Sequence, residues 1–556
     1  MTSLLAFIVL IGVLITAHEL GHFIAAKLAG VKVEVFSIGF GGPIVKTVRG
    51  DTEYRIAWLP LGGYVRMMGA LPGDEPPRPE DRGRGLFDKP PWIRVIIAAA
   101  GPAMNLILPL LIVTPFVTCS AQYDQVPGNR IGAVDQSMPA WQSGLREGDA
   151  IVAINGEPIE AFWQIKRAID GYQPEQGALT IRVDRPGEGE QDFQVTPKAV
   201  PQTNPVLGFS STDYLIGYQP AFLSADVAVA DPNGALAAAG VQTFDRVIAI
   251  DGQPVERYLD VQHKLTALDP GQSVKLRVQR DRPLEAQFPF LVAQDEIELT
   301  FTARGRGEAA QLGMRHASTC VQSVDPEGPA ARVLQRGDCL VAIDGESQSL
   351  GAFLARRLDD RPEEEKMLTV LRDGAETLVA FKRQHEVVDD PFAGEVDRWP
   401  LGFTLLARQS MVAPDDVENN HRLAYGWYEA RTKLAGEFEM TVRMIGGLFS
   451  RQVSASQLSG PLTIFYLAGE SARAGLESFL NLMVLLSLSI GLFNLLPVPV
   501  LDGGQILVAA IEGITRRPLP MRVQTWLQNI GVALILALVL FALFNDAVRM
   551  WRVSGG

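Results

Sequence analysis

Cysteine and histidine are both scarce in this sequence, with three cysteines and six histidines among 556 residues. The cysteines give no sign of a metal site, because Cys119 stands alone and only Cys320 and Cys339 share one segment. An oxidising compartment would allow those two to form a disulfide, and free buried thiols are the open alternative. With so few histidines, chance alone is not expected to produce a histidine-based metal motif.

Basic residues are also fewer than acidic residues. The chain has 50 lysines and arginines against 63 aspartates and glutamates, which gives a net charge of −13. The central region carries this excess, and the two ends are slightly basic. An acidic surface repels phosphate groups, so we expect no nucleic acid as a partner.

Long apolar runs, by contrast, are present near both ends of the chain. Hydrophobic residues make up 47% of the composition and the mean hydropathy is +0.12, which is high for a soluble protein. About 20 apolar residues suffice to cross the roughly 30 Å of hydrocarbon in a bilayer. The stretches of this kind are residues 4–28, 92–117, 479–496 and 526–544. We therefore expect four transmembrane helices.

The first apolar stretch could instead be a secretory signal peptide. Such a peptide has a basic leader and a short apolar region before its cleavage site. The stretch at residues 4–28 lacks that leader, and its apolar pattern continues past any cleavage point. These features favour a retained helix.

Basic residues near the spans set the expected orientation, because they favour the cytoplasmic side of the membrane. Both the loop after the first span and the loop before the last span contain them. They are Lys32, Lys46, Arg49, Arg55, Lys89 and Arg94 in the first loop and Arg516, Arg517 and Arg522 in the second. Both loops are thus expected in the cytoplasm, with the two termini and the large central region outside.

A pattern in the central region occurs three times. Each copy has a helix start rich in small residues, then an acidic residue before a short apolar strand that ends in a hairpin turn. The turns are Asn155-Gly156, Asp251-Gly252 and Asp344-Gly345. Each copy resembles a PDZ domain of the bacterial, circularly permuted kind, and the resemblance covers residues 131–384.

PDZ domains bind an extended peptide at a sheet edge and capture its terminal carboxylate with backbone N–H groups. Ile216-Gly217-Tyr218 and Leu312-Gly313-Met314 precede the second and third copies, where that family places its carboxylate-binding loop. The resemblance therefore implies peptide termini as partners. The alternative is that these modules act as spacers or as a size filter above the membrane, since a fold alone does not establish function.

The first apolar stretch contains a metal-binding motif. His18-Glu19-Leu20-Gly21-His22 matches H-E-x-x-H, in which the histidines lie on one helix face about 6 Å apart and can share an ion. Glu19 lies beside them, placed to take a proton from a metal-bound water. Ionisable groups are costly in the apolar layer and indicate function there. The alternative is an incidental polar patch between packed helices.

Catalytic zinc usually has three protein ligands and a water, so a third ligand is expected from another span. The end of the third span supplies Asp502 after Pro497 and Pro499, which break the helix. Non-helical backbone at membrane depth is tolerated where it lines a cavity, so Asp502 can turn inward. Alternatively, Asp502 caps the helix that follows it.

Together these motifs resemble the site-2 protease family of intramembrane zinc metalloproteases. With the PDZ-like copies, the chain is most similar to the bacterial RseP-like branch of that family, over nearly its whole length. Further matching segments include Gly62-Gly63-Tyr64-Val65-Arg66-Met67, Gly101-Pro102-Ala103-Met104-Asn105 and Ser459-Gly460-Pro461. The third PDZ-like copy is a departure, because that branch typically has two.

The resemblance implies a role for each site residue. His18, His22 and Asp502 hold Zn²⁺, and Glu19 activates the water that attacks a peptide carbonyl. Asn494 holds the substrate backbone near the metal. Gly39, Phe40 and Gly41 belong to a membrane-re-entrant hairpin that offers the unwound substrate a strand edge, although ordinary turn chemistry explains those glycines equally well.

The expected substrates are single-span membrane proteins already shortened on their outer side, such as anti-sigma factors, and signal-peptide remnants. Two other classes compete with a protease. A non-enzymatic membrane scaffold needs no catalytic set, yet both histidines, Glu19 and Asp502 are present. A metal transporter needs a pathway through the membrane, and four spans with one broken helix give little support for one.

The expected fold is a polytopic α-helical membrane protein with four transmembrane helices and extracytoplasmic β-rich PDZ-like domains, located in a bacterial inner membrane. Residues 1–118 form the first two transmembrane helices with a cytoplasmic re-entrant β-hairpin. PDZ-like domains cover residues 127–200, 205–295 and 310–386. Residues 400–475 form an extracytoplasmic linker with an amphipathic helix, and residues 476–556 form the last two transmembrane helices.

Overall fold

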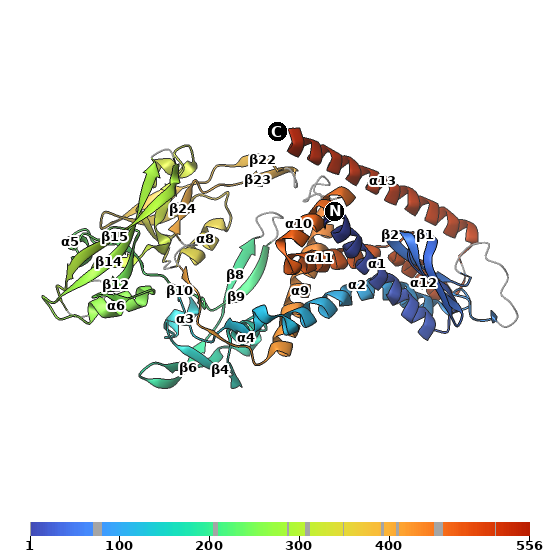
Figure 1. Ribbon diagram of the computed structural model, residues 1–556, viewed down its shortest axis with the longest axis horizontal. Coiled ribbons are helices and arrows are strands. Elements are labelled where there is room, and N and C mark those ends of the chain that lie inside the picture. The colour runs from blue at the N-terminus through green and yellow to red at the C-terminus, as the bar shows by residue number, and fades with distance from the viewer. Residues whose placement is uncertain are drawn as a thin grey trace. The chain divides into compact units, whose positions relative to one another are not determined.

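A computed structural model describes residues 2–69, 81–203, 210–285, 288–305, 312–347, 350–390, 394–406, 411–449, 460–517 and 519–555 (Figure 1). The predicted starts of two PDZ-like domains, at residues 205 and 310, and Ser459 lie outside these ranges. The chain divides into two compact units. A mostly helical unit comprises Met1–Ala121, Asp389–Glu395 and His421–Gly556, and a β-rich unit comprises Gln122–Val388 and Val396–Asn420.

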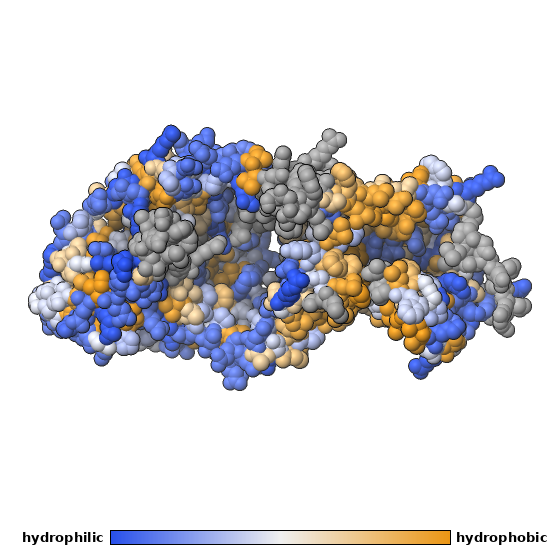
Figure 2. All heavy atoms as spheres, turned by 45° about the horizontal axis from the view of Figure 1, so that its top comes forward, coloured by the Kyte–Doolittle hydropathy of each residue, from blue (hydrophilic) through white to orange (hydrophobic). Residues whose placement is uncertain are grey.

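Among the described residues, four helices of the helical unit are long and apolar enough to cross a membrane, as the sequence predicts. They are α1 (Thr2–Leu28), α2 (Pro91–Cys119), α11 (Leu476–Asn494) and α13 (Met521–Gly555). Hydrophobic residues cover much of the surface that this unit shows in Figure 2. That surface suits contact with lipid tails, because leaving it in water would cost free energy.

Further helices are described in this unit. They are α9 (Arg422–Phe449), α10 (Pro461–Ala474) and α12 (Asp502–Thr515). The predicted break after the third span is present, since α11 ends at Asn494 and α12 begins at Asp502. Gly503 makes this fold-back possible, because a methyl group there would lie 2.3 Å from the carbonyl oxygens of Leu495 and Leu496.

The loop after α1 forms the predicted hairpin, with β1 (Val33–Arg49) and β2 (Thr52–Met67). Residues 35–38 of β1 pair on both sides, with residues 53–56 of β2 on one side and residues 63–66 on the other. β2 therefore bends around β1, and its residues 63–66 form an outer edge among the described strands. Gly39 and Gly41 have φ of +93° and +92° beside irregular register, a conformation that favours glycine.

The β-rich unit contains three similar sheets, which we call modules 1, 2 and 3. Their strand orders are β5-β4-β6-β7, β15-β14-β12-β11-β16 and β19-β18-β20-β21. Module 1 contains β4 (Ala150–Ile154), β5 (Glu157–Pro158), β6 (Leu179–Arg185) and β7 (Gly189–Val195). Module 2 contains β11 (Asp226–Val229), β12 (Asp245–Ile250), β14 (Ser273–Glu285), β15 (Phe288–Thr302) and β16 (Met314–His316). Module 3 contains β18 (Cys339–Ile343), β19 (Glu346–Ser347), β20 (Lys366–Arg372) and β21 (Ala375–Phe381). Each module has its own buried apolar cluster.

The same buried ion pair recurs in every module. The acidic residue that precedes or opens the apolar strand accepts two hydrogen bonds from an arginine on the neighbouring strand. The pairs are Asp149 with Arg185, Asp245 with Arg280, and Asp338 with Arg372, and each aspartate is 1% exposed. Two-point contact satisfies both carboxylate oxygens and fixes their direction. The recurrence supports the repeat read from the sequence.

Backbone hydrogen bonds attach each glycine segment to the module before it. The carbonyl of Gly217 accepts from Asp135 of module 1, and the carbonyl of Gly313 accepts from Ala230 of module 2. The sequence offered no third segment, but Gly402 plays this part for module 3, where its carbonyl accepts from Asp325. All three glycines have positive φ, at +87°, +62° and +67°.

The two cysteines of the third repeat are joined in a disulfide, Cys320–Cys339. Both residues are buried, at 0% and 3% exposed, and they link the start of module 3 to strand β18. Cys119 is a free, exposed cysteine at the end of α2. The structure thus selects the disulfide from the two alternatives that the sequence left open.

Candidate metal centre

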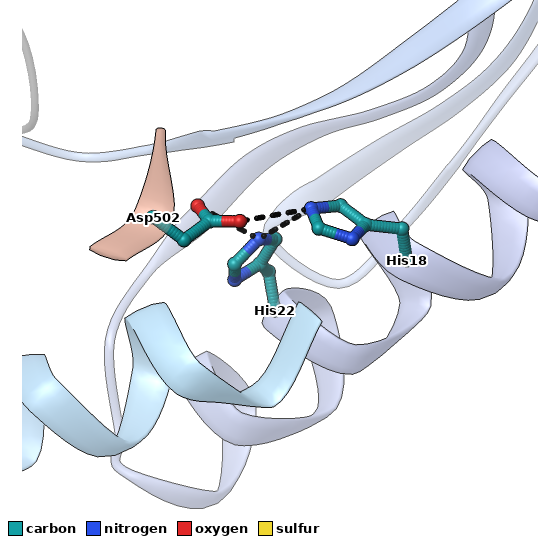
Figure 3. Close-up of side chains that lie close together, drawn as sticks. All are labelled: His18, His22 and Asp502. Atoms are coloured by element: carbon teal, nitrogen blue, oxygen red, sulfur yellow. Dashed lines mark hydrogen bonds and ion pairs between the residues drawn. The ribbon is translucent and has the colours of Figure 1, made fainter. Parts of the chain in front are cut away.

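His18 and His22 project from one face of α1 toward the same point (Figure 3). Their spacing of four residues is close to one helical turn of 3.6, which places the two side chains one above the other. Their Nε2 atoms lie 3.2 Å apart, and both residues are buried, at 8% and 9% exposed. The sequence pattern therefore predicts correctly that the two side chains share one face of the helix.

Asp502 completes the group from α12, at the first position of that helix. One of its carboxylate oxygens lies 3.1 Å from His18 Nε2, and the other lies 3.4 Å from His22 Nε2. Asp502 does not cap α12 with its side chain. The capping alternative is therefore not what the geometry shows.

The spacing of these atoms suits one zinc ion. Tetrahedral bonds of about 2.0–2.1 Å place neighbouring ligand atoms about 3.3 Å apart. The three observed separations are 3.1, 3.2 and 3.4 Å. Among the described residues, His18, His22 and Asp502 are the one group of three metal-binding side chains whose ligand atoms lie this close together.

Helix α2 orients the second histidine. His22 Nδ1 lies 2.8 Å from the carbonyl oxygen of Ile97, so Nδ1–H donates there and Nε2 is left free to bind a metal. The close approach of the helices depends on two glycines. A methyl group on Gly21 would lie 2.2 Å from the carbonyl oxygen of Ala100, and one on Gly101 would lie 2.2 Å from His22 Nε2.

A cavity of about 540 Å³ opens beside these ligands. Residues of α1, β2, α2, α12 and α13 line it, among them Glu19, Arg94, Gln505 and Gln528. Glu19 thus shares a chamber with the three ligands, as a general base requires. The chamber provides room for a peptide segment next to the metal-binding atoms.

One wall of the cavity is the outer edge of β2. Tyr64, Val65 and Met67 line it, and Glu19 lies among the same lining residues. Tyr64 and Val65 belong to the family-matching segment at residues 62–67, and the sequence predicts no individual role for them. The signal that could have identified them is the adjacent pair Gly62-Gly63. A side chain on Gly62 would collide with the Phe40 ring, and one on Gly63 would collide with the backbone of Ser37.

The expected substrate-binding residues lie outside the lining of this cavity. Asn494 is the last residue of α11, and Gly39, Phe40 and Gly41 lie where β1 bends. Phe40 is nevertheless connected to the cavity wall, because its ring stacks on that of Tyr64 at 6.1 Å between centroids. A role for these four residues in binding substrate stays a prediction.

The sequence also matches known proteins along its whole length. The sequence model of Peptidase family M50 matches residues 6–538. The chain belongs to peptidase family M50. Among its relatives, a Ralstonia nicotianae protein provisionally named a zinc metalloprotease is 30% identical over 100% of both chains. A Neisseria meningitidis protein with a name of the same kind is 28% identical, over 99% of this chain and 100% of that protein.

The regulator of sigma-E protease RseP of Escherichia coli is 28% identical to this chain, and the match covers 99% of each protein. This M50 protein is therefore a zinc metalloprotease of the site-2 type and a multi-pass protein of the inner membrane. The family and the clustered ligands both favour the protease over the scaffold and over the metal transporter.

Proposed function

We propose that this protease hydrolyses peptide bonds inside the transmembrane segments of single-span membrane proteins. One observation carries the proposal: the metal-binding group lies deep within a membrane span. His18 is about 24 Å along α1 from Thr2, at about 1.5 Å per residue, and α1 is a candidate span. A soluble substrate could not reach a site at that depth, whereas a helix within the bilayer could.

In this proposal His18, His22 and Asp502 hold Zn²⁺ through two imidazole nitrogens and a carboxylate. A bound zinc ion polarises a peptide carbonyl and lowers the pKa of a coordinated water to about 7. The Glu19 carboxylate takes the proton from the attacking water and delivers it to the departing amide nitrogen. Glu19 and Val65 both line the cavity, and a methyl group on Gly63 would lie 3.3 Å from Glu19 Cγ, so the outer edge of β2 lies close to this side chain.

Peptide bonds within a helix are shielded, so the substrate must unwind before attack. The outer edge of β2 suits an extended segment, because residues 63–66 pair with β1 on one side only. Adding the substrate there as a further strand would carry its backbone past Glu19. In this arrangement Gly39, Phe40 and Gly41 shape the bend behind that edge, and Asn494 contacts the substrate backbone.

The three modules, read as PDZ-like domains on the outer side of the membrane, would select substrates. Exclusion of proteins with bulky outer domains and capture of newly made peptide termini are both compatible with this arrangement. The Escherichia coli relative is named a regulator of sigma-E. We propose anti-sigma factors as one substrate class for this chain, and signal-peptide remnants as another. If a chain lacking residues 131–385 left full-length substrates as resistant as before, the selective role would be excluded.

Cleavage by the wild type and by Glu19→Gln tests the catalytic proposal. Both purified proteins should contain zinc, and only the wild type should cleave a single-span substrate in detergent. Glu470→Gln, an exposed residue of α10, is the matched control and should cleave normally. Equal cleavage by wild type and Glu19→Gln would refute the role of Glu19.

A further inference from the structure

A buried amide lies directly behind the first histidine. Asn105 of α2 is 0% exposed, and its Nδ2 lies 3.4 Å from His18 Nδ1. Its Oδ1 has no hydrogen-bond partner among the described residues. An unsatisfied polar atom is costly inside a protein, so this side chain calls for an explanation.

Metal binding by His18 decides which end of the amide must face the ring. When Nε2 binds an ion, Nδ1 carries the remaining ring proton and becomes a donor. An amide N–H₂ group opposite that donor would repel it. Rotating the amide group by 180° exchanges Oδ1 and Nδ2, which are similar in size, and places Oδ1 opposite His18 Nδ1 as an acceptor.

A hydrogen bond from α11 also fixes the backbone of Asn105 beside His18. Its carbonyl would ordinarily accept from the residue four positions later, but Pro109 has no N–H. Ser487 of α11 takes that place, and its Oγ donates to the Asn105 carbonyl oxygen at 2.7 Å. Gly491 lets α11 come this close, since a methyl group there would lie 3.3 Å from Asn105 Cβ.

We infer that Asn105 is a positioning residue for the metal centre, whose amide oxygen accepts the Nδ1–H of His18 and so presents Nε2 to the ion. The inference rests on the proposed ligand set of His18, His22 and Asp502. It gives the two histidines matched supports from α2, because Ile97 supplies a backbone carbonyl to His22 and Asn105 supplies a side-chain oxygen to His18.

Zinc affinity of the purified full-length chain tests the inference without relying on activity. Competition with a chelator should show affinity about 10–100-fold lower for Asn105→Leu, which keeps the size and loses the acceptor. Asn105→Asp retains an acceptor and should stay close to wild type. Thr114→Val removes another polar side chain from α2, away from the centre, and should leave the affinity unchanged. The metal-free forms should unfold at similar temperatures.

The outcomes separate this inference from the function on which it rests. Zinc that is lost in His18→Ala and bound with unchanged affinity in Asn105→Leu would overturn the positioning role alone. Zinc content that does not depend on His18 would overturn the proposed metal site itself. If Asn105→Leu does not fold, Asn105→Ala carries the same expectation. Recovery of cleavage by Asn105→Leu at high zinc concentration would support the inference.

Discussion

Gly101 leaves the space in which the His22 ring lies. A methyl group at this position would come within 2.2 Å of His22 Nε2, the atom proposed to bind zinc. The ring is also tied to α2 through Ile97, so it cannot move aside without losing that hydrogen bond. The glycine is therefore part of the metal centre although it has no side chain.

Gly101→Ala should accordingly displace His22 and lower both zinc content and cleavage. A displacement of about 1 Å is enough to cost about 100-fold in rate. Zinc analysis and cleavage of a single-span substrate measure the two effects. Gly12→Ala is the matched control, because a methyl group on Gly12 of α1 meets nothing within 4 Å. Full zinc content in Gly101→Ala would contradict the prediction.

Asp546 of α13 caps a helix other than its own. Its carboxylate accepts from the backbone N–H groups of Gly460, Leu462 and Thr463 at 3.0–3.2 Å, and the residue is 0% exposed. Asp546→Ala would leave these N–H groups at the start of α10 without a partner, at a cost of about 0.5–2 kcal/mol. We expect faster hydrogen exchange at residues 460–465. Phe544→Leu, an exposed change on α13, should not alter that exchange.

Glu147 gives module 1 a titration near neutral pH. Burial raises the pKa of this carboxyl from 4.5 to about 7, against the opposing effect of Arg257. Its Oε1 has no hydrogen-bond partner in the described part of the chain. The folded state therefore keeps a proton between pH 4.5 and 7 that the unfolded state has lost, so this contribution to stability is complete at low pH and disappears as pH rises through 7.

Glu147→Gln should remove that dependence. At about 1.4 kcal/mol per pKa unit, the difference in free energy of unfolding between wild type and Glu147→Gln should change by at most about 3 kcal/mol from pH 4.5 to pH 8. Unfolding of the full-length chain in detergent at several pH values measures it. Comparing the two proteins cancels other titrations, such as that of His316, whose pKa burial lowers to about 4. Parallel curves for the two proteins would contradict the assignment.

The disulfide should stabilise module 3. It joins residues separated by 19 positions. Closing a loop of that size lowers the conformational entropy of the unfolded chain, which stabilises the folded state by about 3 kcal/mol. The double variant Cys320→Ala, Cys339→Ala should therefore unfold earlier than wild type, whereas Cys119→Ala should not, because that cysteine is exposed and free. Alkylation before and after reduction checks the premise. Cys119 should react without reduction, and reaction of all three thiols without reduction would exclude the bond.

Local patterns in the sequence were sufficient wherever a feature depends on neighbouring residues. The four spans follow from apolar length, and the alignment of His18 with His22 follows from the helical repeat. The hairpin turns of the three modules follow from Asn-Gly and Asp-Gly, and the first of each pair has positive φ. The position of Glu19 beside the histidine pair follows from its place between His18 and His22 in the sequence.

Features that join distant segments needed more than these patterns. The proline-broken span and the resemblance to a family indicated Asp502, but its distance from the histidines and its lack of a capping bond appear only in three dimensions. The glycine segment of module 3 was missed because Gly402 lies far beyond the strands that it completes. The edge at Tyr64 and Val65 was likewise missed, because β2 bends around β1 and the pairing follows from that bend.

By itself the sequence determined that His18, His22 and the Glu19 carboxylate lie together in an apolar stretch long enough to span a membrane, since one helix holds all three at fixed spacing. The tertiary structure decided what surrounds them. It brings Asp502 to the pair from the last part of the chain, sets the Ile97 carbonyl and the Asn105 amide behind the rings, and leaves room for the His22 ring at Gly101. The reason is that close packing between helices depends on the shapes of all partners at once, which no single segment encodes.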